Sequence, residues 1–526
     1  MIGLAMLLTL AAAAYAVRRA LRIPLIPLLL LAGMALRALG LALGEEVARS
    51  ALDIGLAVIV FGAGMELNPK RFGQQRSNVW VIGLAQFAII GLGATLWAII
   101  FGQEWLTALY IGLAISTSST LIIVRLLKER QQMFEPFGRV VTGVLLLQDL
   151  LIILLIVVLM RLPDGMDALL HGLGGMTIML VLCFAGLRYV MPFIVLRMKI
   201  DQETLALTIL AVLFLFMGLA YVLDLPIITG AFLAGVSLSA FPVNSAARGL
   251  VQSLTAFFVS MFFIVLGGLM TWPAAAEWGL ILTLSAWVLV ATPLLVVAIA
   301  CRRGLNARSA IEGGLLLAMT SEFSLLVALQ GIMAGQLSMA TFNVLAMTTV
   351  LTMTLTPLWA TDRTTWWLMH RFRSAAPTRL QGDVPARDHV VMLGYGKGSS
   401  VVVKALRNEG HEVVIVNDDP VVVEELVEAG ERAVCGDGSD PRTLDMVNAS
   451  AARALISSMR RVRDAEKVLA QLQPDPPLLI ARVFEPAEAD RIRARGGVPV
   501  LSSAAAADAF MQWFQQTRER EKQASA

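Results

Sequence analysis

Residues 137–161 read FGRVVTGVLLLQDLLIILLIVVLMR. This apolar run is long enough to cross a bilayer as one helix, but Gln148 and Asp149 interrupt it at its middle. Counted from Phe137 at about 1.5 Å per residue, Asp149 lies about 18 Å into the helix, near the bilayer midplane. A charged side chain there costs about 3 kcal/mol or more to insert, so this position indicates a proton or cation site. The alternative is a structural Asp paired with a neighbouring helix.

The whole chain has the composition of a polytopic α-helical membrane protein. Of its 526 residues, 57% are hydrophobic and 15% charged, and the mean hydropathy is +0.74. The net charge of +3 gives no indication of a nucleic-acid partner, and Cys183, Cys301 and Cys435 have neither metal-ligand nor disulfide spacing. We expect about thirteen spans, at 2–18, 23–42, 50–67, 79–101, 105–127, 137–161, 170–197, 204–222, 226–241, 251–270, 277–301, 309–335 and 339–360.

The basic residues of the loops predict the orientation. The first apolar stretch has its arginines after it, so it is expected to be a span that starts outside and not a cleaved signal peptide. The loops that would then face the cytoplasm carry Arg18, Arg19, Arg22, Lys70, Arg71, Arg76, Lys128, Arg130, Arg139, Arg197, Lys199, Arg248, Arg302, Arg303 and Arg308. The opposite loops carry Arg37, Arg49 and Arg161. This asymmetry predicts an outside N-terminus and a cytoplasmic C-terminal domain.

Two further spans are polar at their centres. Span 105–127 contains the run Ser116, Thr117, Ser118, Ser119 and Thr120, and span 309–335 contains Thr320, Ser321, Glu322 and Ser324. Short hydroxyl residues are poor helix formers, and two such spans in corresponding halves predict inverted repeats with crossed, broken helices. Packing of small residues between helices is the alternative.

These groups predict the chemistry of the site. Asp149 can hold either a proton or one monovalent cation, so the two compete, and one-for-one exchange is electroneutral. Oxygens of Gln148 and of residues 116–120 would replace part of the hydration shell, which suits K⁺ better than a divalent ion. Ser321 and Glu322 are further candidates, although Glu322 could instead cap a half-helix.

The polar C-terminal part is expected to comprise a linker (361–388), a Rossmann-like α/β domain (389–515) and a polar tail (516–526). Residues 389–420, HVVMLGYGKGSSVVVKALRNEGHEVVIVNDDP, predict strand, glycine turn, helix and strand. Gly394 and Gly396 open the helix, and Ser399 takes the place of the third glycine. The expected nucleotide-binding residues are Gly394, Tyr395, Gly396, Lys397, Ser399, Asn417, Asp418, Asp437 and Arg482.

The membrane part resembles the second cation:proton antiporter family, and more narrowly the Kef-type K⁺/H⁺ antiporters. The residues that carry the resemblance are IPLIPLLLLAGM (23–34), IGLAVIVFGAGMEL (54–67), STSSTLIIVRLLKER (116–130), VLLLQDLL (144–151), LDLPIITGAFLAGVSLSA (223–240), MFFIVLGG (261–268) and TSEFSLLV (320–327). The resemblance implies a homodimer in the bacterial inner membrane that works by an elevator movement of spans 3–6 and 10–13 against spans 1, 2, 8 and 9. Sodium-exchanging, electrogenic relatives have two adjacent acids at 148–149 and a lysine within 254–270, and this chain has neither feature.

The C-terminal part resembles the RCK (KTN, TrkA-N) domain of potassium transporters and channels. This resemblance implies regulation by NAD(H), ATP/ADP or AMP. Asn417 stands where an acid usually contacts the ribose, and Phe484 stands near the place of a glutathione-contacting arginine.

The sequence therefore predicts an electroneutral K⁺/H⁺ antiporter, surrounded by membrane lipid and regulated by a nucleotide. A Na⁺/H⁺ antiporter is the main alternative, and an RCK-gated cation channel is less favoured because LGYG at 393–396 lies outside every predicted span. A membrane-anchored dehydrogenase is disfavoured because residues 440–526 offer no substrate domain. No enzyme activity and no resident metal are expected.

Overall fold

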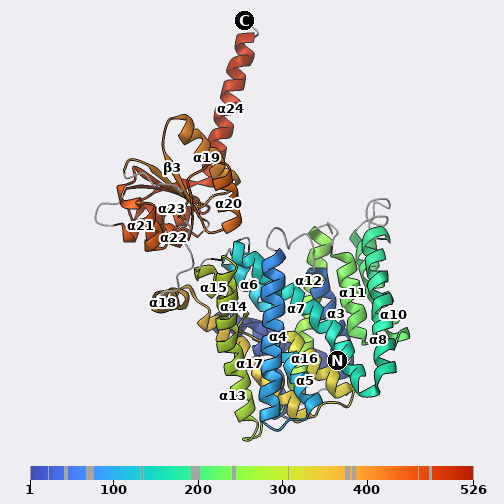
Figure 1. Cartoon of the computed structure of the whole chain (residues 1–526). Coiled ribbons are helices and arrows are strands. Elements are labelled where there is room, and N and C mark those ends of the chain that lie inside the picture. Colours follow the sequence, from blue (N-terminus) through green and yellow to red (C-terminus); the bar gives the residue numbers. More distant parts are fainter. Residues whose placement is uncertain are drawn as a thin grey trace. The chain divides into compact units, whose positions relative to one another are not determined.

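A computed structural model gives the structure of the chain (Figure 1). It describes residues 2–21, 23–40, 45–66, 76–130, 132–133, 135–190, 202–239, 245–305, 307–372, 380–381, 387–459, 461–472 and 477–524. The chain forms two compact units, one of 1–299 and 311–368 and the other of 300–310 and 369–526. Parts of the predicted spans, at 41–42, 67, 191–197 and 240–241, and parts of the predicted linker, at 373–379 and 382–386, lie outside the described residues.

The first unit is built from helices. They are α1 (Ile2–Leu21), α2 (Leu25–Ala38), α3 (Glu45–Glu66), α4 (Arg76–Ile100), α5 (Trp105–Ile115), α6 (Thr120–Glu129), α7 (Pro136–Arg161), α8 (Met166–Ala185), α10 (Gln202–Val222), α11 (Ile227–Leu238), α12 (Ser245–Leu269), α13 (Trp278–Ala286), α14 (Thr292–Arg302), α15 (Ala307–Leu317), α16 (Glu322–Met333) and α17 (Met339–Trp359). The end of α14, from 300, and the start of α15, to 310, belong to the second unit. The short turn η2 (Leu162–Asp164) follows α7, and the π-helical turns η3 (Gly186–Val190) and η4 (Trp287–Ala291) follow α8 and α13. Among the described residues, seven helical segments are long and apolar enough to cross a membrane. The number of thirteen spans stays a prediction.

Two of these segments are broken at the predicted places. The helix that starts at Trp105 stops at Ile115 and resumes as α6, whose cap is Ser119: its Oγ accepts a hydrogen bond from Ile122 N (3.3 Å). The second break runs from Leu317 to the start of α16, where Ser321 Oγ accepts from Phe323 N (3.1 Å). Hydroxyl side chains bond the chain locally and so stabilise the ends of helices better than their middles.

A close approach of α4 to α5 lies just before the first break. A Cβ on Gly112 of α5 would lie 2.7 Å from the carbonyl oxygen of Gly91 on α4, so only glycine fits there. The helix α4 also packs against α7. The polar centre of α7 and the first break are thereby held beside the middle of α4.

The second unit contains a twisted sheet in the order β1-β4-β3-β2-β5-β6-β7. All neighbours are parallel except β1 and β4. The strands are β1 (Leu380–Gln381), β2 (Val390–Leu393), β3 (Val413–Asn417), β4 (Ala433–Cys435), β5 (Ala454–Ser457), β6 (Leu478–Val483) and β7 (Val498–Leu501). The order β4 to β7 is that of a dinucleotide-binding sheet, which binds ligands at the carboxyl ends of the strands where the order reverses, here between β2 and β5.

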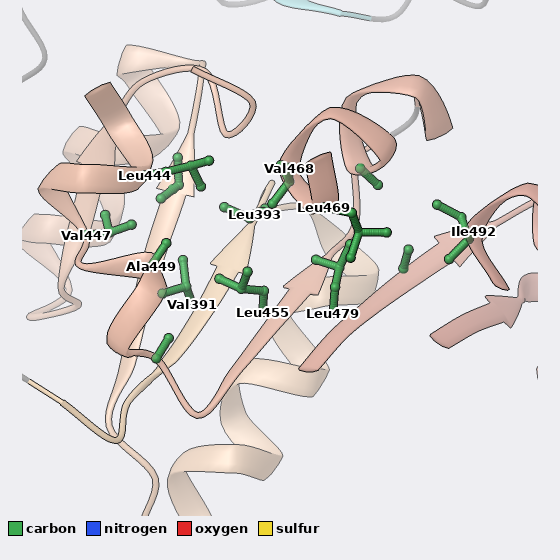
Figure 2. Close-up of a cluster of buried hydrophobic side chains, with 14 of the residues drawn as sticks. Val391, Leu393, Leu444, Val447, Ala449, Leu455, Val468, Leu469, Leu479 and Ile492 are labelled. Carbon is green, nitrogen blue, oxygen red and sulfur yellow. The ribbon is translucent and has the colours of Figure 1, made fainter. Parts of the chain in front are cut away.

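Helices cover both faces of this sheet. They are α19 (Lys397–Asn408), α20 (Pro420–Glu428), α21 (Pro441–Met446), α22 (Val462–Gln471) and α23 (Pro486–Arg493), with the turn η5 (Ala449–Ala451). Alternate strand residues point to opposite faces, so Val391 and Leu455 join one core (Figure 2) and Met392 joins the other. The helix α18 (Asp362–Phe372) and β1 lie within the predicted linker, and α24 (Ser502–Ala524) extends through most of the predicted polar tail.

Candidate functional site

The buried acid Asp149 lies in the middle of α7 with no exposed surface. Its Oδ2 accepts a hydrogen bond from the hydroxyl of Thr120, the first residue of α6 (2.8 Å). Its Oδ1 is buried and has no hydrogen-bond partner among the described residues. The carboxylate is therefore fixed by one oxygen, and the other oxygen has no hydrogen bond from the described residues.

Gln148 and Ser118 are joined next to this acid. The backbone N–H of Ser118 donates to Gln148 Oε1 (3.0 Å), and the Ser118 hydroxyl donates to the carbonyl oxygen of Leu317 (2.7 Å). Gln86, on α4, donates from Nε2 to the same hydroxyl oxygen (3.0 Å). All of these side chains are buried, so this network links both helix breaks with α4 and α7.

Glu322 begins α16 and bonds to the start of the other half-helix. Its Oε2 accepts from the Ser119 hydroxyl (2.7 Å), and its Oε1 accepts from Leu121 N (3.4 Å). A carboxylate near two helix N-termini offsets their positive dipole ends. Both oxygens of Glu322 are thus engaged in holding the crossing, whereas Asp149 keeps one oxygen unbonded.

Two threonines of α17 complete the second break. Thr352 Oγ1 contacts the Thr320 hydroxyl (2.9 Å), and Thr356 Oγ1 donates to the carbonyl oxygen of Ala318. Neither these threonines nor Gln86 could be distinguished from the rest of their apolar spans by the sequence alone. The sequence feature that could have identified them is a polar residue within an apolar span. This feature is ambiguous, because such side chains often bond only their own helix, as the Thr348 hydroxyl bonds Val344 O (2.8 Å).

The other predicted cation-site residues differ in their bonding. Ser116 donates to the carbonyl oxygen of Leu113 in its own helix (2.7 Å), and Ser321 caps α16. Thr117 is buried, and its hydroxyl has no partner among the described residues. The structure therefore brings 116–120, Gln148, Asp149, Ser321 and Glu322 to one crossing, with different bonding for each.

In the second unit, the glycine turn follows β2 as predicted. Gly394 has φ +86°, which favours glycine, and its carbonyl oxygen accepts from Ser458 Oγ (2.8 Å) after β5. Gly396 N–H donates to Ser399 Oγ (2.7 Å), and Tyr395 N–H donates to Asn417 Oδ1 (3.2 Å) at the end of β3. Four predicted nucleotide-site positions thus meet with Asn417 at the carboxyl ends of neighbouring strands.

Arg482 lies close to the first turn of α19, the helix that begins after the glycine turn. A Cβ on Gly398 would lie 3.7 Å from Arg482 Nη1, and Arg482 Nε donates to Ser502 Oγ (2.9 Å). Its guanidinium also stacks on Phe484, 4.8 Å from the ring centre. A helix N-terminus next to a guanidinium is suited to an anionic phosphate group. Lys397 is the first residue of α19, and its side chain lies outside the described part of the structure.

The remaining predicted residues are Asp418, half-buried after β3, and Asp437, which follows β4. Asp437 Oδ1 accepts from Ser439 N (2.8 Å), and Oδ2 accepts from Arg308, a residue of the same compact unit (2.8 Å). Burial opposes ionisation of Asp437, but the Arg308 guanidinium and the Ser439 hydrogen bonds lower its pKa below the ordinary value. The Asp437 carboxylate is therefore engaged within the protein.

Comparison with known proteins agrees with this geometry. Residues 5–361 match the sequence model of the transmembrane sodium/hydrogen exchanger, and residues 390–503 match that of the TrkA-N domain. The chain belongs to the sodium/hydrogen exchanger family. The prediction of a cation/proton antiporter family with a C-terminal RCK-type domain is confirmed.

Two curated relatives extend over both parts of this exchanger. The chain is 25% identical to the putative cation/proton antiporter YbaL of Escherichia coli (strain K12), over 88% of this chain and 87% of that protein. It is 27% identical to the glutathione-regulated potassium-efflux system protein KefC of Salmonella schwarzengrund (strain CVM19633), over 77% of this chain but only 66% of KefC. Both are named as transport proteins, in agreement with the prediction that the chain is not an enzyme.

A solved antiporter structure is similar in fold to the membrane part of this chain. The sodium proton antiporter MjNhaP1 from Methanocaldococcus jannaschii matches 69% of this chain and 97% of its own, at 15% identity and a TM-score of 0.51. The predicted antiporter fold is therefore confirmed.

Proposed function

We propose that this exchanger moves K⁺ against H⁺, one for one, and that Asp149 carries each ion in turn. The observation that carries the proposal is the fully buried Asp149 carboxylate, which keeps Oδ1 unbonded beside the crossing of two broken helices. Because a proton and a cation compete for one carboxylate, only one of them is carried at a time, and this competition alone couples their movements. The same net charge then crosses in both directions, and the exchange is electroneutral.

The choice of K⁺ rests on the ligand chemistry and on a relative. A carboxylate that keeps one oxygen unbonded beside amide and hydroxyl oxygens favours a weakly hydrated monovalent cation, and KefC is named as a potassium-efflux protein. Na⁺ is the second candidate, because the family is named for sodium/hydrogen exchange.

The proposal extends to how the exchanger works in its membrane. We place a homodimer in the bacterial inner membrane, with the N-terminus outside, the second unit in the cytoplasm and lipid around the spans. The broken helices would move as part of a core that alternates between the two sides. The predicted domain bounds, 1–360, 361–388, 389–515 and 516–526, belong to this proposal.

The second unit would regulate exchange by binding an adenine nucleotide. AMP, ATP/ADP and NAD(H) are the candidates, with the phosphate at the start of α19 beside Arg482. Asn417 lies at the end of β3, where an acid usually contacts the ribose, and so gives no particular preference for NAD(H). Phe484 stacks on Arg482, and the proposal includes no glutathione dependence.

Reconstituted exchange tests the main proposal. The purified full chain in liposomes, with a pH-sensitive dye inside, is exposed to gradients of K⁺, Rb⁺, Na⁺ and Li⁺, and net current is recorded on a supported membrane. K⁺-driven proton movement without net current is expected. Net current under a K⁺ gradient that does not depend on pH would instead indicate a channel, and exchange with Na⁺ alone would indicate the sodium antiporter.

A substitution ties the activity to the acid. Asp149→Asn is expected to abolish exchange while the protein still folds and keeps its oligomeric state in size-exclusion chromatography. Asp167→Asn, at an exposed residue of α8, is the matched control and keeps wild-type exchange. Exchange by Asp149→Asn at the control rate refutes the assignment.

A further inference from the structure

Most hydroxyl groups of residues 116–120, at the first break, donate hydrogen bonds to other atoms of the protein. Ser116 bonds its own helix, Ser118 bonds Leu317, Ser119 bonds Glu322, and Thr120 bonds Asp149. Thr117 alone among the five residues 116–120 has a hydroxyl with no partner among the described residues. The run therefore holds one hydroxyl with no hydrogen bond, whereas the donating hydroxyls are oriented by the groups that accept their protons.

The oxygen of Gln148 already accepts one hydrogen bond. The backbone N–H of Ser118 needs an acceptor, so the atom that faces it is the Gln148 oxygen (3.0 Å). The Gln148 amide nitrogen is buried and has no partner among the described residues. An amide nitrogen cannot bind a cation, so Gln148 acts on the site through Ser118.

Gln86 has the opposite orientation. The Ser118 hydroxyl gives its proton to Leu317 O (2.7 Å), so its oxygen needs a donor, and the atom that faces it is the Gln86 amide nitrogen (3.0 Å). The Gln86 oxygen is left buried without a partner among the described residues, and the residue is 2% exposed. An unpaired carbonyl oxygen in such surroundings has a large desolvation cost that a cation would offset.

Three residues with unpartnered oxygens are thus linked through Ser118 and its chain neighbour. Gln86 donates a hydrogen bond to Ser118, and Thr117 directly precedes Ser118 in the chain. Gln148 accepts the backbone N–H of Ser118, and Asp149 directly follows Gln148. They are one carboxylate oxygen, one hydroxyl oxygen and one amide oxygen, the ligand types that K⁺ and Na⁺ take when they lose water.

We propose that Gln86 is a further ligand of the transported cation, whose Oε1 completes a site with Asp149 Oδ1 and Thr117 Oγ1. The Nε2 of the same amide orients Ser118, which holds the two breaks together. This inference rests on the proposed exchange function and adds a residue on α4 to the site. It also distinguishes Thr117, as a ligand, from Thr120, which acts on the cation through its hydrogen bond to Asp149.

The test compares Gln86→Met, which keeps the length of the side chain, with wild type in the full chain. Two quantities are measured: the K⁺ concentration that gives half-maximal exchange, and the rise in melting temperature of the detergent-solubilised protein on adding KCl in place of choline chloride. Gln86→Met is expected to raise the half-maximal concentration about tenfold and to abolish the thermal shift, since a lost ligand weakens binding by about this factor. Gln330→Met, at a buried glutamine of α16 eight residues beyond Glu322, is the control and keeps both values.

A second variant keeps the proposal testable if Gln86→Met does not fold. Thr117→Val is expected to change both quantities in the same direction, whereas Thr142→Val, whose hydroxyl bonds its own helix at Gly138 O (2.8 Å), changes neither. A slower exchange with an unchanged half-maximal concentration and an unchanged thermal shift in both site variants overturns the proposal, because loss of structure alone has that effect. A wild-type protein that is stabilised by KCl but exchanges no ions would refute the proposed function and leave the cation site standing.

Discussion

The Thr120 hydroxyl donates a 2.8 Å hydrogen bond to Asp149 Oδ2 and so joins the start of a half-helix to the buried acid. Thr120 is the first residue of α6, directly after its cap, and its position depends on the break in the span. Any movement of the broken helices relative to α7 therefore acts on the carboxylate directly.

Thr120→Val keeps the shape of the side chain and removes this donor. A hydrogen bond to a charged group contributes about 1.5–3 kcal/mol, so we expect the half-maximal K⁺ concentration for exchange to rise about tenfold or more. Initial rates in proteoliposomes over a range of K⁺ concentrations measure the change. Thr120→Ser restores the donor and should exchange as wild type does; equal defects in the Val and Ser variants contradict the role of the hydroxyl.

Glu322 is expected to act mainly on stability. Its two oxygens accept from Ser119 Oγ and Leu121 N, and Glu322→Ala takes this acceptor from both donors, of which Ser119 is fully buried. We expect the free energy of unfolding to fall by about 2 kcal/mol or more, with a smaller loss for Glu322→Gln, which keeps one acceptor oxygen. Thermal melting in detergent measures this loss of stability, and Glu104→Gln, at an exposed position, is the control. A Glu322→Gln protein of full stability that exchanges no ions would instead assign Glu322 to ion binding.

The sequence contains the local part of the proposed cation site. Asp149 is a charged residue in an apolar run, and residues 116–120 and 320–324 are poor helix formers, so the acid and both breaks could be predicted from their neighbours in the chain. The pairing of the breaks could not be predicted in detail, because Ser118 and Leu317 are far apart in the sequence and meet only when the helices pack. Sequence patterns indicate which residues are polar and buried, but not which of their atoms are already bonded.

Gln86 and Asp437 show that the sequence does not reveal long-range contacts: it does not predict Gln86 as a site residue, and it predicts Asp437 as one although Asp437 bonds within the protein. Gln86 is a single amide in an apolar helix, and only its contact with Ser118 connects it to the site. Asp437 follows a strand of a nucleotide-binding fold, and its contacts with Ser439 and Arg308 engage it within the protein. By contrast, the contact of Tyr395 with Asn417 follows from the strand order, because β2 and β3 are parallel neighbours that end together.

Asn417→Asp is expected to change the nucleotide preference. The aspartate keeps the acceptor for Tyr395 N–H and gains a second acceptor oxygen at the place where acids bond ribose hydroxyls. We expect NADH to bind about tenfold more tightly than to wild type, which corresponds to about 1.4 kcal/mol. NADH fluorescence titration of the full chain measures the affinity, and Asn408→Asp, exposed at the other end of α19, is the control. An unchanged affinity for NADH in Asn417→Asp contradicts the expected ribose contact.

Gly396→Asp separates the stability of the second unit from its ligand binding. Gly396 precedes α19 with an extended backbone at φ −165°, and a Cβ there would meet no atom within 4 Å, so a side chain fits without strain. Aspartate at this capping position stabilises the helix by a few tenths of a kcal/mol, but its charge repels a phosphate at the same helix end. We therefore expect a melting temperature that is equal or higher and a nucleotide affinity about tenfold lower than in Gly396→Asn, which caps the helix without a charge. Isothermal titration with ATP, AMP and NADH measures the affinities; binding to the Asp variant as tight as to the Asn variant would place the phosphate away from the start of α19.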